Sequence, residues 1–158
     1  MRVYVESLLP CNADAAWAEV QKSTLLLEVI QPLAFVRPLE GETFPDEWTV
    51  GTTVRCRTVL LGLFPLGIRS IFFEKIDAST RVIQSREFDA LVRTWDHKIE
   101  VDPVSASECR YSDEIEVEAG VLTPLVWLFA QVFYRHRQRR WQRVARRLNA
   151  LLPCSRTS

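Results

Sequence analysis

Apolar and polar residues alternate with a period of two through the middle of the chain, from residue 51 to residue 119. This pattern predicts antiparallel strands, because successive side chains of a strand point to opposite faces of a sheet. The predicted strands are 52–61, 67–77, 81–88, 92–102 and 108–118. A turn between the first two strands is expected at 64–67, Phe-Pro-Leu-Gly, since proline and glycine are typical of turns.

The two ends of the chain predict a different structure. Residues 2–9 and 33–38 are expected to form strands, and 13–21 and 23–30 two short helices between them. After Gly120 the apolar period becomes 3.6, which predicts one long helix to about residue 151. The side expected to face the core holds Leu122, Leu125, Val126, Phe129, Val132, Phe133, His136, Arg140, Val144, Leu148 and Leu151, while Trp127 and Leu128 lie off it.

This order of elements predicts an α+β fold, in which a twisted antiparallel sheet buries its apolar face against the long helix. A doubly wound parallel sheet is excluded, because the central strands lack helical crossovers. The chain of 158 residues suits one domain, expected at 1–152, followed by a C-terminal tail at 153–158.

Composition adds several exclusions. The four cysteines, Cys11, Cys56, Cys109 and Cys154, are far apart and accompany only two histidines, so no metal site is expected. The chain has no glycine-rich phosphate loop, and no cofactor is expected. Glu6 interrupts any apolar signal segment, which favours the cytoplasm and free thiols. The longest apolar stretch, 121–133, is too short to span a bilayer.

Charge is distributed unevenly although the net charge is zero. Residues 1–120 hold 12 Lys and Arg against 20 Asp and Glu, and residues 121–158 hold eight arginines and no acid. We expect the arginine stripe of the predicted helix to pair with the acid-rich body; its members are Arg135, Arg139, Arg143, Arg146 and Arg147. Transient contact with an anionic membrane or an anionic headgroup is the alternative. Nucleic acid is not expected as a partner, because the acidic body would repel phosphate.

Two polar residues, His97 and Asp113, fall on the apolar faces of their strands, with Tyr111 on the same face as Asp113. A buried carboxylate must be paired, protonated or exposed to a wet cavity. One interpretation is a cavity in which His97 or Asp113 is a general base and Tyr111 a donor. The other is a structural pair that braces the helix. In both, His97 and Asp113 share one interior, within hydrogen-bonding reach of the last helix.

Several segments resemble the START/birch-allergen-like helix-grip proteins of the SRPBCC superfamily, and in particular small bacterial members described as polyketide-cyclase-like or ligand-binding. They are residues 3–20, the Trp95-Asp96-His97 strand, 111–116 and 133–137. The resemblance implies a curved sheet of about seven strands that grips the C-terminal helix around an apolar pocket. It also implies a sheet wall with Trp95, His97, Tyr111 and Asp113, and a helix wall with Phe129, Phe133 and His136.

Known members of this superfamily bind lipids, sterols, polyketides or plant hormones, and some catalyse cyclisation or dehydration. The function favoured here is non-catalytic binding of a hydrophobic or amphipathic small molecule, lipid or polyketide-like, by a monomer or homodimer. The alternative is a cyclase or dehydratase that uses His97 and Asp113 as acid and base.

Overall fold

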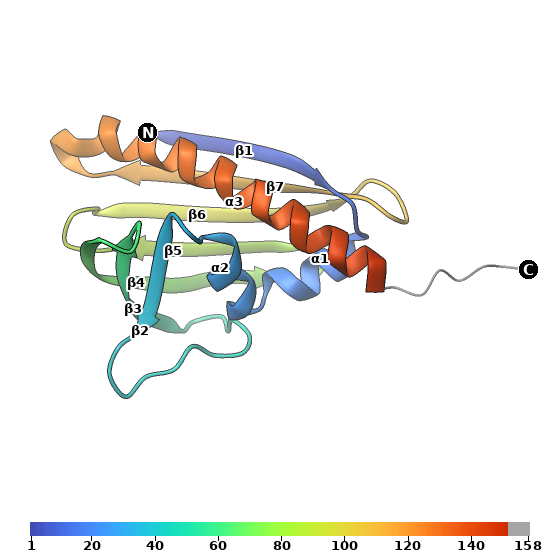
Figure 1. Cartoon of the computed structure of the whole chain (residues 1–158), viewed down its shortest axis with the longest axis horizontal. Coiled ribbons are helices and arrows are strands. Elements are labelled where there is room, and N and C mark those ends of the chain that lie inside the picture. Colours follow the sequence, from blue (N-terminus) through green and yellow to red (C-terminus); the bar gives the residue numbers. More distant parts are fainter. Residues whose placement is uncertain (152–158) are drawn as a thin grey trace, which may run out of the picture.

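The structure, a computed structural model that describes residues 1–151, is an antiparallel sheet curved around a long C-terminal helix (Figure 1). Its seven strands lie in the order β1-β7-β6-β5-β4-β3-β2. The elements are β1 (Arg2–Leu9), α1 (Ala13–Val20), α2 (Ser23–Val29), β2 (Ala34–Pro38), β3 (Thr53–Leu60), β4 (Phe64–Asp77), β5 (Val82–Phe88), β6 (Thr94–Pro103), β7 (Cys109–Glu118), the 3₁₀ turn η1 (Gly120–Leu122) and α3 (Thr123–Leu151). The predicted α+β helix-grip fold is therefore confirmed. Cys154 and the tail 153–158 lie outside the described residues.

Local sequence explains how α1 begins and which face β6 buries. Asn12 caps α1, because its side-chain oxygen accepts a hydrogen bond of 2.8 Å from the Ala15 amide. The strict alternation of β6 buries Trp95, His97 and Ile99 on the face toward α3. Buried Cys11, Cys56 and Cys109 are free thiols, as expected.

The turn between β3 and β4 differs from the expected one. It lies at Leu61–Leu63, where Leu61 and Gly62 take positive φ values of 53° and 72°. Pro65 and Gly67 lie inside β4, where the register shifts and the strand bulges. A bulge accommodates proline and a glycine with positive φ, so these two residues mark a kink in the strand and not its end.

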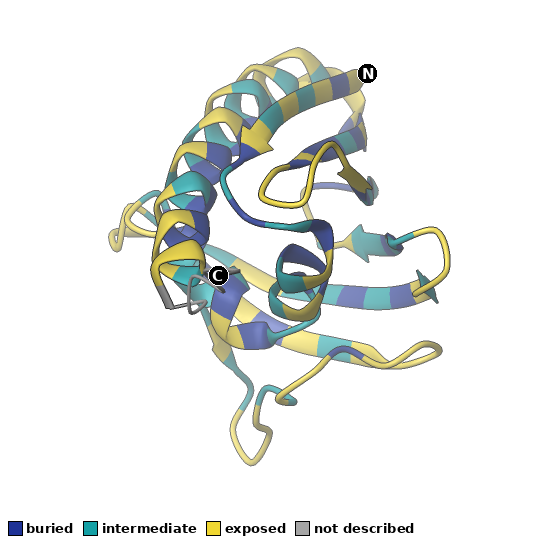
Figure 2. Ribbon diagram, turned by 90° about the vertical axis from the view of Figure 1, so that its right-hand side faces the viewer, coloured by how far each residue is buried: buried dark blue, intermediate teal, exposed yellow. Residues whose placement is uncertain are grey.

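The side of α3 that faces the sheet matches the expected one only in part (Figure 2). As expected, Val144 is buried, and the core also receives Val126, Phe129, Phe133 and Leu148. Leu125 and Val132 are 66% and 56% exposed, while His136 and Arg140 are only partly buried. The buried side consists of Ala130, Tyr134, Arg137, Gln138, Trp141, Val144 and Ala145. Hydrophobicity alone could not identify this side, because Arg137 and Gln138 are buried as hydrogen-bonding partners of the sheet.

The arginine stripe lies on the opposite, outer side of α3, so the expected pairing with the acidic body is wrong for most of it. Within the described residues, Arg147 alone of the stripe pairs with an acid, Glu28 of α2. Arg135 instead binds Gln131 one turn earlier. None of the helices in residues 1–151 has the length and apolar character needed to cross a membrane.

Candidate functional site

A cavity of about 120 Å³ lies between the inner face of the sheet and helices α2 and α3. This is several times the room of roughly 10–15 Å³ that one water needs. Most of the wall is apolar, with Leu25, Leu26, Ile30, Leu60, Ile71, Phe73, Ile83, Trp95, Ile99, Phe129 and Phe133 among the lining residues. The polar lining comes from Thr58, Arg69, Ser85, Glu87, His97, Tyr134 and Arg137. The site is thus an apolar chamber with a concentrated polar region.

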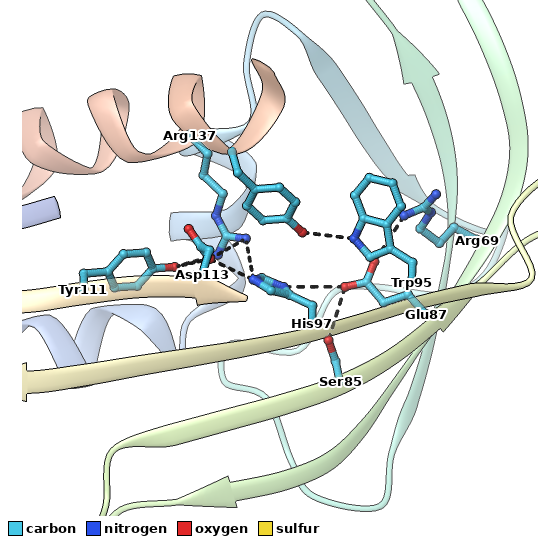
Figure 3. Close-up of polar contacts among 9 residues, drawn as sticks. Arg69, Ser85, Glu87, Trp95, His97, Tyr111, Asp113 and Arg137 are labelled. Atoms are coloured by element: carbon cyan, nitrogen blue, oxygen red, sulfur yellow. Dashed lines mark hydrogen bonds and ion pairs between the residues drawn. The ribbon is translucent and has the colours of Figure 1, made fainter. Parts of the chain in front are cut away.

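Asp113 on β7 anchors one half of this polar region (Figure 3). Its carboxylate lies 2.8 Å from His97 Nε2 and accepts a hydrogen bond of 3.0 Å from the Tyr111 hydroxyl. From α3, Gln138 donates to Asp113 at 3.1 Å, and the Arg137 guanidinium lies 3.5 Å away. Four partners from β6, β7 and α3 therefore hold one carboxylate that has no exposed surface.

These contacts decide the charge of Asp113. Burial raises the pKa of Asp113. The charge of Arg137 and the hydrogen bonds from His97 and Gln138 lower this pKa by a larger amount, so the net shift is downward. An ionised carboxylate only accepts hydrogen bonds, so the proton between the two residues belongs to His97 Nε2. Burial raises the pKa of Tyr111 well above its ordinary value, which keeps this hydroxyl a donor at neutral pH.

Glu87 on β5 anchors the other half. It pairs with Arg69 at 3.3 Å, accepts from Ser85 at 3.2 Å and faces His97 Nδ1 at 3.9 Å. Arg69 also binds Asp89 at 2.7 Å. Burial lowers the pKa of Arg69, but these two carboxylates raise it by more. His97 thus lies between two carboxylates, one behind the cavity wall and one in it (Figure 3).

Two aromatic side chains, Trp95 of β6 and Tyr134 of α3, pack beside this polar region. Trp95 donates from Nε1 to the Tyr134 hydroxyl at 3.0 Å, and the Arg69 guanidinium lies 4.9 Å from the centre of the Trp95 ring. Burial and the nearby charge of Glu87 raise the pKa of Tyr134, so its hydroxyl also stays protonated. Three lining residues still carry a buried polar atom with no hydrogen-bond partner within the described residues: the Thr58 hydroxyl and the Nε atoms of Arg69 and Arg137.

Residues 7–145 match the family described as "Domain of unknown function (DUF8410)". The chain belongs to this family. No curated protein matches its sequence. The match spans every strand that lines the cavity and most of α3, so the site lies within the DUF8410 region.

Three solved structures share this fold at low sequence identity. The START superfamily protein from Mycobacterium smegmatis is 12% identical, with a TM-score of 0.66 over 93% of this chain and 98% of its own. The Zhui aromatase/cyclase from Streptomyces sp. R1128 is 12% identical, with a TM-score of 0.62 over 100% and 99%. Norcoclaurine synthase from Thalictrum flavum, solved with dopamine and hydroxybenzaldehyde, is 16% identical, with a TM-score of 0.64 over 100% and 89%. The START-like helix-grip fold expected from the sequence is thereby confirmed.

The structure divides the expected site residues of this DUF8410 protein into three groups. Trp95, His97, Phe129 and Phe133 line the cavity. Tyr111 and Asp113 are buried behind its wall and reach it through His97 and Arg137. His136 binds the Gln31 carbonyl oxygen at 2.7 Å and is outside the cavity lining, so its expected place on the helix wall is wrong. The prediction that His97 and Asp113 share one interior with a helix residue in reach is confirmed.

Sequence reasoning missed several residues that the structure brings into the site, above all Arg69, Glu87 and Arg137. Arg69 and Glu87 alternate in phase with Ile71 and Ile83, so the strand period that identified His97 also places these two charges inward. The alternation of β4 and β5 is therefore the signal in the sequence that identifies both charges. Within residues 1–151, no group of three or more His, Cys, Asp and Glu side chains could hold a metal ion.

Proposed function

We propose that the protein binds an amphipathic small molecule, lipid-like or polyketide-like, in the cavity between the sheet and α3. Its apolar body would lie against the aliphatic and aromatic wall, and its affinity would come mainly from apolar burial at roughly 25 cal/mol per Å². The observation that carries the proposal is the polar region around Thr58, Glu87 and His97 inside an otherwise apolar chamber. A cavity for a purely apolar molecule would not need these groups, whose burial is costly.

The arrangement of charge favours a ligand whose polar group is a neutral hydroxyl or phenol. Arg69 is already paired with Glu87 and Asp89, and Arg137 with Asp113, so the cations are neutralised. A ligand carboxylate would meet Glu87 without a free cation to balance it. A hydroxyl can donate to Glu87 and bind the unpartnered hydroxyl of Thr58.

Displacement of an uncharged fluorescent probe, N-phenyl-1-naphthylamine, tests this proposal. We expect 2-naphthol to displace the probe at lower concentration than 2-naphthoate. The hydroxyl of 2-naphthol can donate to Glu87, whereas the carboxylate of 2-naphthoate would meet Glu87 with the same charge. Thr58→Val should weaken naphthol binding about two- to tenfold, the loss expected for one hydrogen bond. Thr94→Val on the partly exposed start of β6 is the matched control. Equal displacement by 2-naphthol and 2-naphthoate, or no binding of the probe, would contradict the proposal. Native mass spectrometry of freshly purified protein is a separate experiment that would identify a natural ligand.

A cyclase or dehydratase activity is the second candidate, and the His97–Asp113 contact favours it. A carboxylate that fixes the proton on Nε2 makes Nδ1, which faces Glu87 at 3.9 Å, the nitrogen that would accept a proton from a bound substrate. In this role His97 would be the general base and Asp113 its positioning partner. Cyclisation of a poly-β-keto thioester analogue by the parent protein, lost in His97→Gln, would support it, and equal rates in both proteins would exclude it.

We also propose that residues 1–152 act as one domain in the cytoplasm. Strands β1 to β7 form one continuous sheet, and α3 packs against β1 and β7 at its edge. Three buried cysteines are free thiols, which suits a reducing compartment.

A further inference from the structure

The outer side of α3 carries one continuous stripe of exposed residues that the proposed cavity function does not use. Its members are Leu125, Leu128, Val132, Arg135, Arg139, Arg143 and Arg146, all exposed. At about 100° per residue, they fall within an arc of about 80°, opposite the buried side that contains Tyr134 and Trp141. Val121, in the turn before α3, extends the stripe and is 96% exposed.

The stripe is divided by chemistry along its length. Its first half is apolar, and Leu125, Leu128 and Val132 are each more than half exposed. Its second half is cationic, and residues 121–151 contain no acid at all. The stripe's Arg139, Arg143 and Arg146 form no ion pair with any acid in the part of the chain that the structure describes. Folding therefore leaves both the apolar area and the positive charge available to a partner.

We propose that this outer stripe of α3 docks the protein onto a membrane surface rich in anionic lipid. A helix that lies in the membrane interface needs apolar side chains that enter the headgroup region and cations that meet lipid phosphates. The stripe supplies both on one face, and a guanidinium can contact a phosphate through two hydrogen bonds. The helix stays on the sheet during docking, because Arg137 and Gln138 hold it from the opposite side.

Other occupants fit this surface less well. A second copy packed along the stripe would set arginines against arginines in a parallel arrangement and against leucines in an antiparallel one. Nucleic acid would satisfy the arginines but leave Leu125, Leu128 and Val132 in water. An anionic membrane is the partner whose chemistry matches both halves.

Co-sedimentation with vesicles tests the proposal. We expect the parent protein to bind vesicles of phosphatidylcholine mixed with phosphatidylglycerol and not vesicles of phosphatidylcholine alone. The triple variant Arg139→Gln/Arg143→Gln/Arg146→Gln should bind about a hundredfold more weakly, since each arginine near an anionic surface contributes roughly fivefold. Added salt should weaken binding of the parent protein.

A matched control removes the same charge elsewhere. Arg57, Arg93 and Arg110 are exposed residues of the sheet and its loops, so Arg57→Gln/Arg93→Gln/Arg110→Gln should keep most of the vesicle binding. Leu125→Ser/Leu128→Ser should reduce binding while leaving the fold intact, as checked by circular dichroism. The proposal would be overturned if the parent ignored anionic vesicles, if both arginine variants lost binding equally, or if the leucine variant bound normally. It would also be overturned if the parent were a dimer that the leucine variant dissociated and vesicle binding were absent.

Discussion

At the scale of single residues, Asp113 shows how a buried charge fixes the relation between sheet and helix. The carboxylate is fully buried, and an unpaired charge in that place would cost several kcal/mol. Arg137 and Gln138 remove this cost only if α3 lies at the position where both side chains reach β7. The contact therefore defines where along its axis, and in which rotation, the helix is placed.

Asp113→Asn should lower the free energy of unfolding by about 3–5 kcal/mol at neutral pH, because it leaves Arg137 buried without its counter-charge. The folded pKa of Asp113 is depressed, so its stabilising effect is fully present above the unfolded value of about 3.9 and is lost as pH falls through the folded pKa. Urea unfolding of both proteins from about pH 7 down to about pH 3 should show their difference shrinking in acid. A difference that stayed constant over this range would show that the charge of Asp113 is not what stabilises the fold.

The sequence was sufficient to place His97 and Asp113 inside, because strand alternation is strict on β6 and β7. It was not sufficient to identify Arg137 as their partner. On a helix the buried side is found from apolar residues, and a buried arginine looks like a surface residue until the carboxylate it meets is known. His136 was placed on the wrong side for the same reason.

At the scale of elements, the β3–β4 hairpin shows why boundaries are harder to predict than strands. Both strands were expected within a few residues of their observed bounds, since the period of two depends on many positions. The turn, in contrast, depends on very few positions. Pro65 and Gly67 suggested a turn, whereas Leu61, an unusual residue for positive φ, forms one.

Leu61→Asn should raise the free energy of unfolding by about 0.5–1 kcal/mol. Leucine at positive φ is strained, while asparagine tolerates that region, and the half-exposed Leu61 side chain gives up little packing. Leu63→Asn is the control in the same turn, at a position without positive φ, and should give no gain. Thermal or urea unfolding of the two variants measures this directly, and an equal effect at both positions would contradict the role of backbone strain.

At the scale of the whole molecule, the acidic body and the basic helix are opposite in charge and packed together, but within the described residues only Arg137 and Arg147 of α3 form ion pairs with the body. The ion pair between Arg147 and Glu28 joins α3 to α2, whereas Arg139 is exposed and forms no ion pair within the described residues. Overall complementarity of charge therefore predicts little about which arginines stabilise the fold.

Arg139→Glu should leave the melting temperature unchanged or slightly higher, because the new acid lies four residues from both Arg135 and Arg143. Arg147→Glu should lower the free energy of unfolding by about 0.2–1 kcal/mol through loss of the Glu28 pair. Thermal unfolding in low and high salt measures the melting temperatures of the Arg139→Glu and Arg147→Glu variants and of the parent protein. A large destabilisation by Arg139→Glu would indicate that the acidic body does stabilise the outer arginines.

The pairing of β1 with β7 has a consequence for how the protein is made. Arg2 lies opposite Glu116, and Leu9 opposite Cys109, so the first strand finds its neighbour about a hundred residues later (Figure 1). During synthesis the growing chain can form the hairpins from β2 onward in sequence, while β1 must wait beside the ribosome until β7 has emerged. Contacts this distant in sequence close slowly, so the joining of β1 to β7 is expected to be a late event in folding.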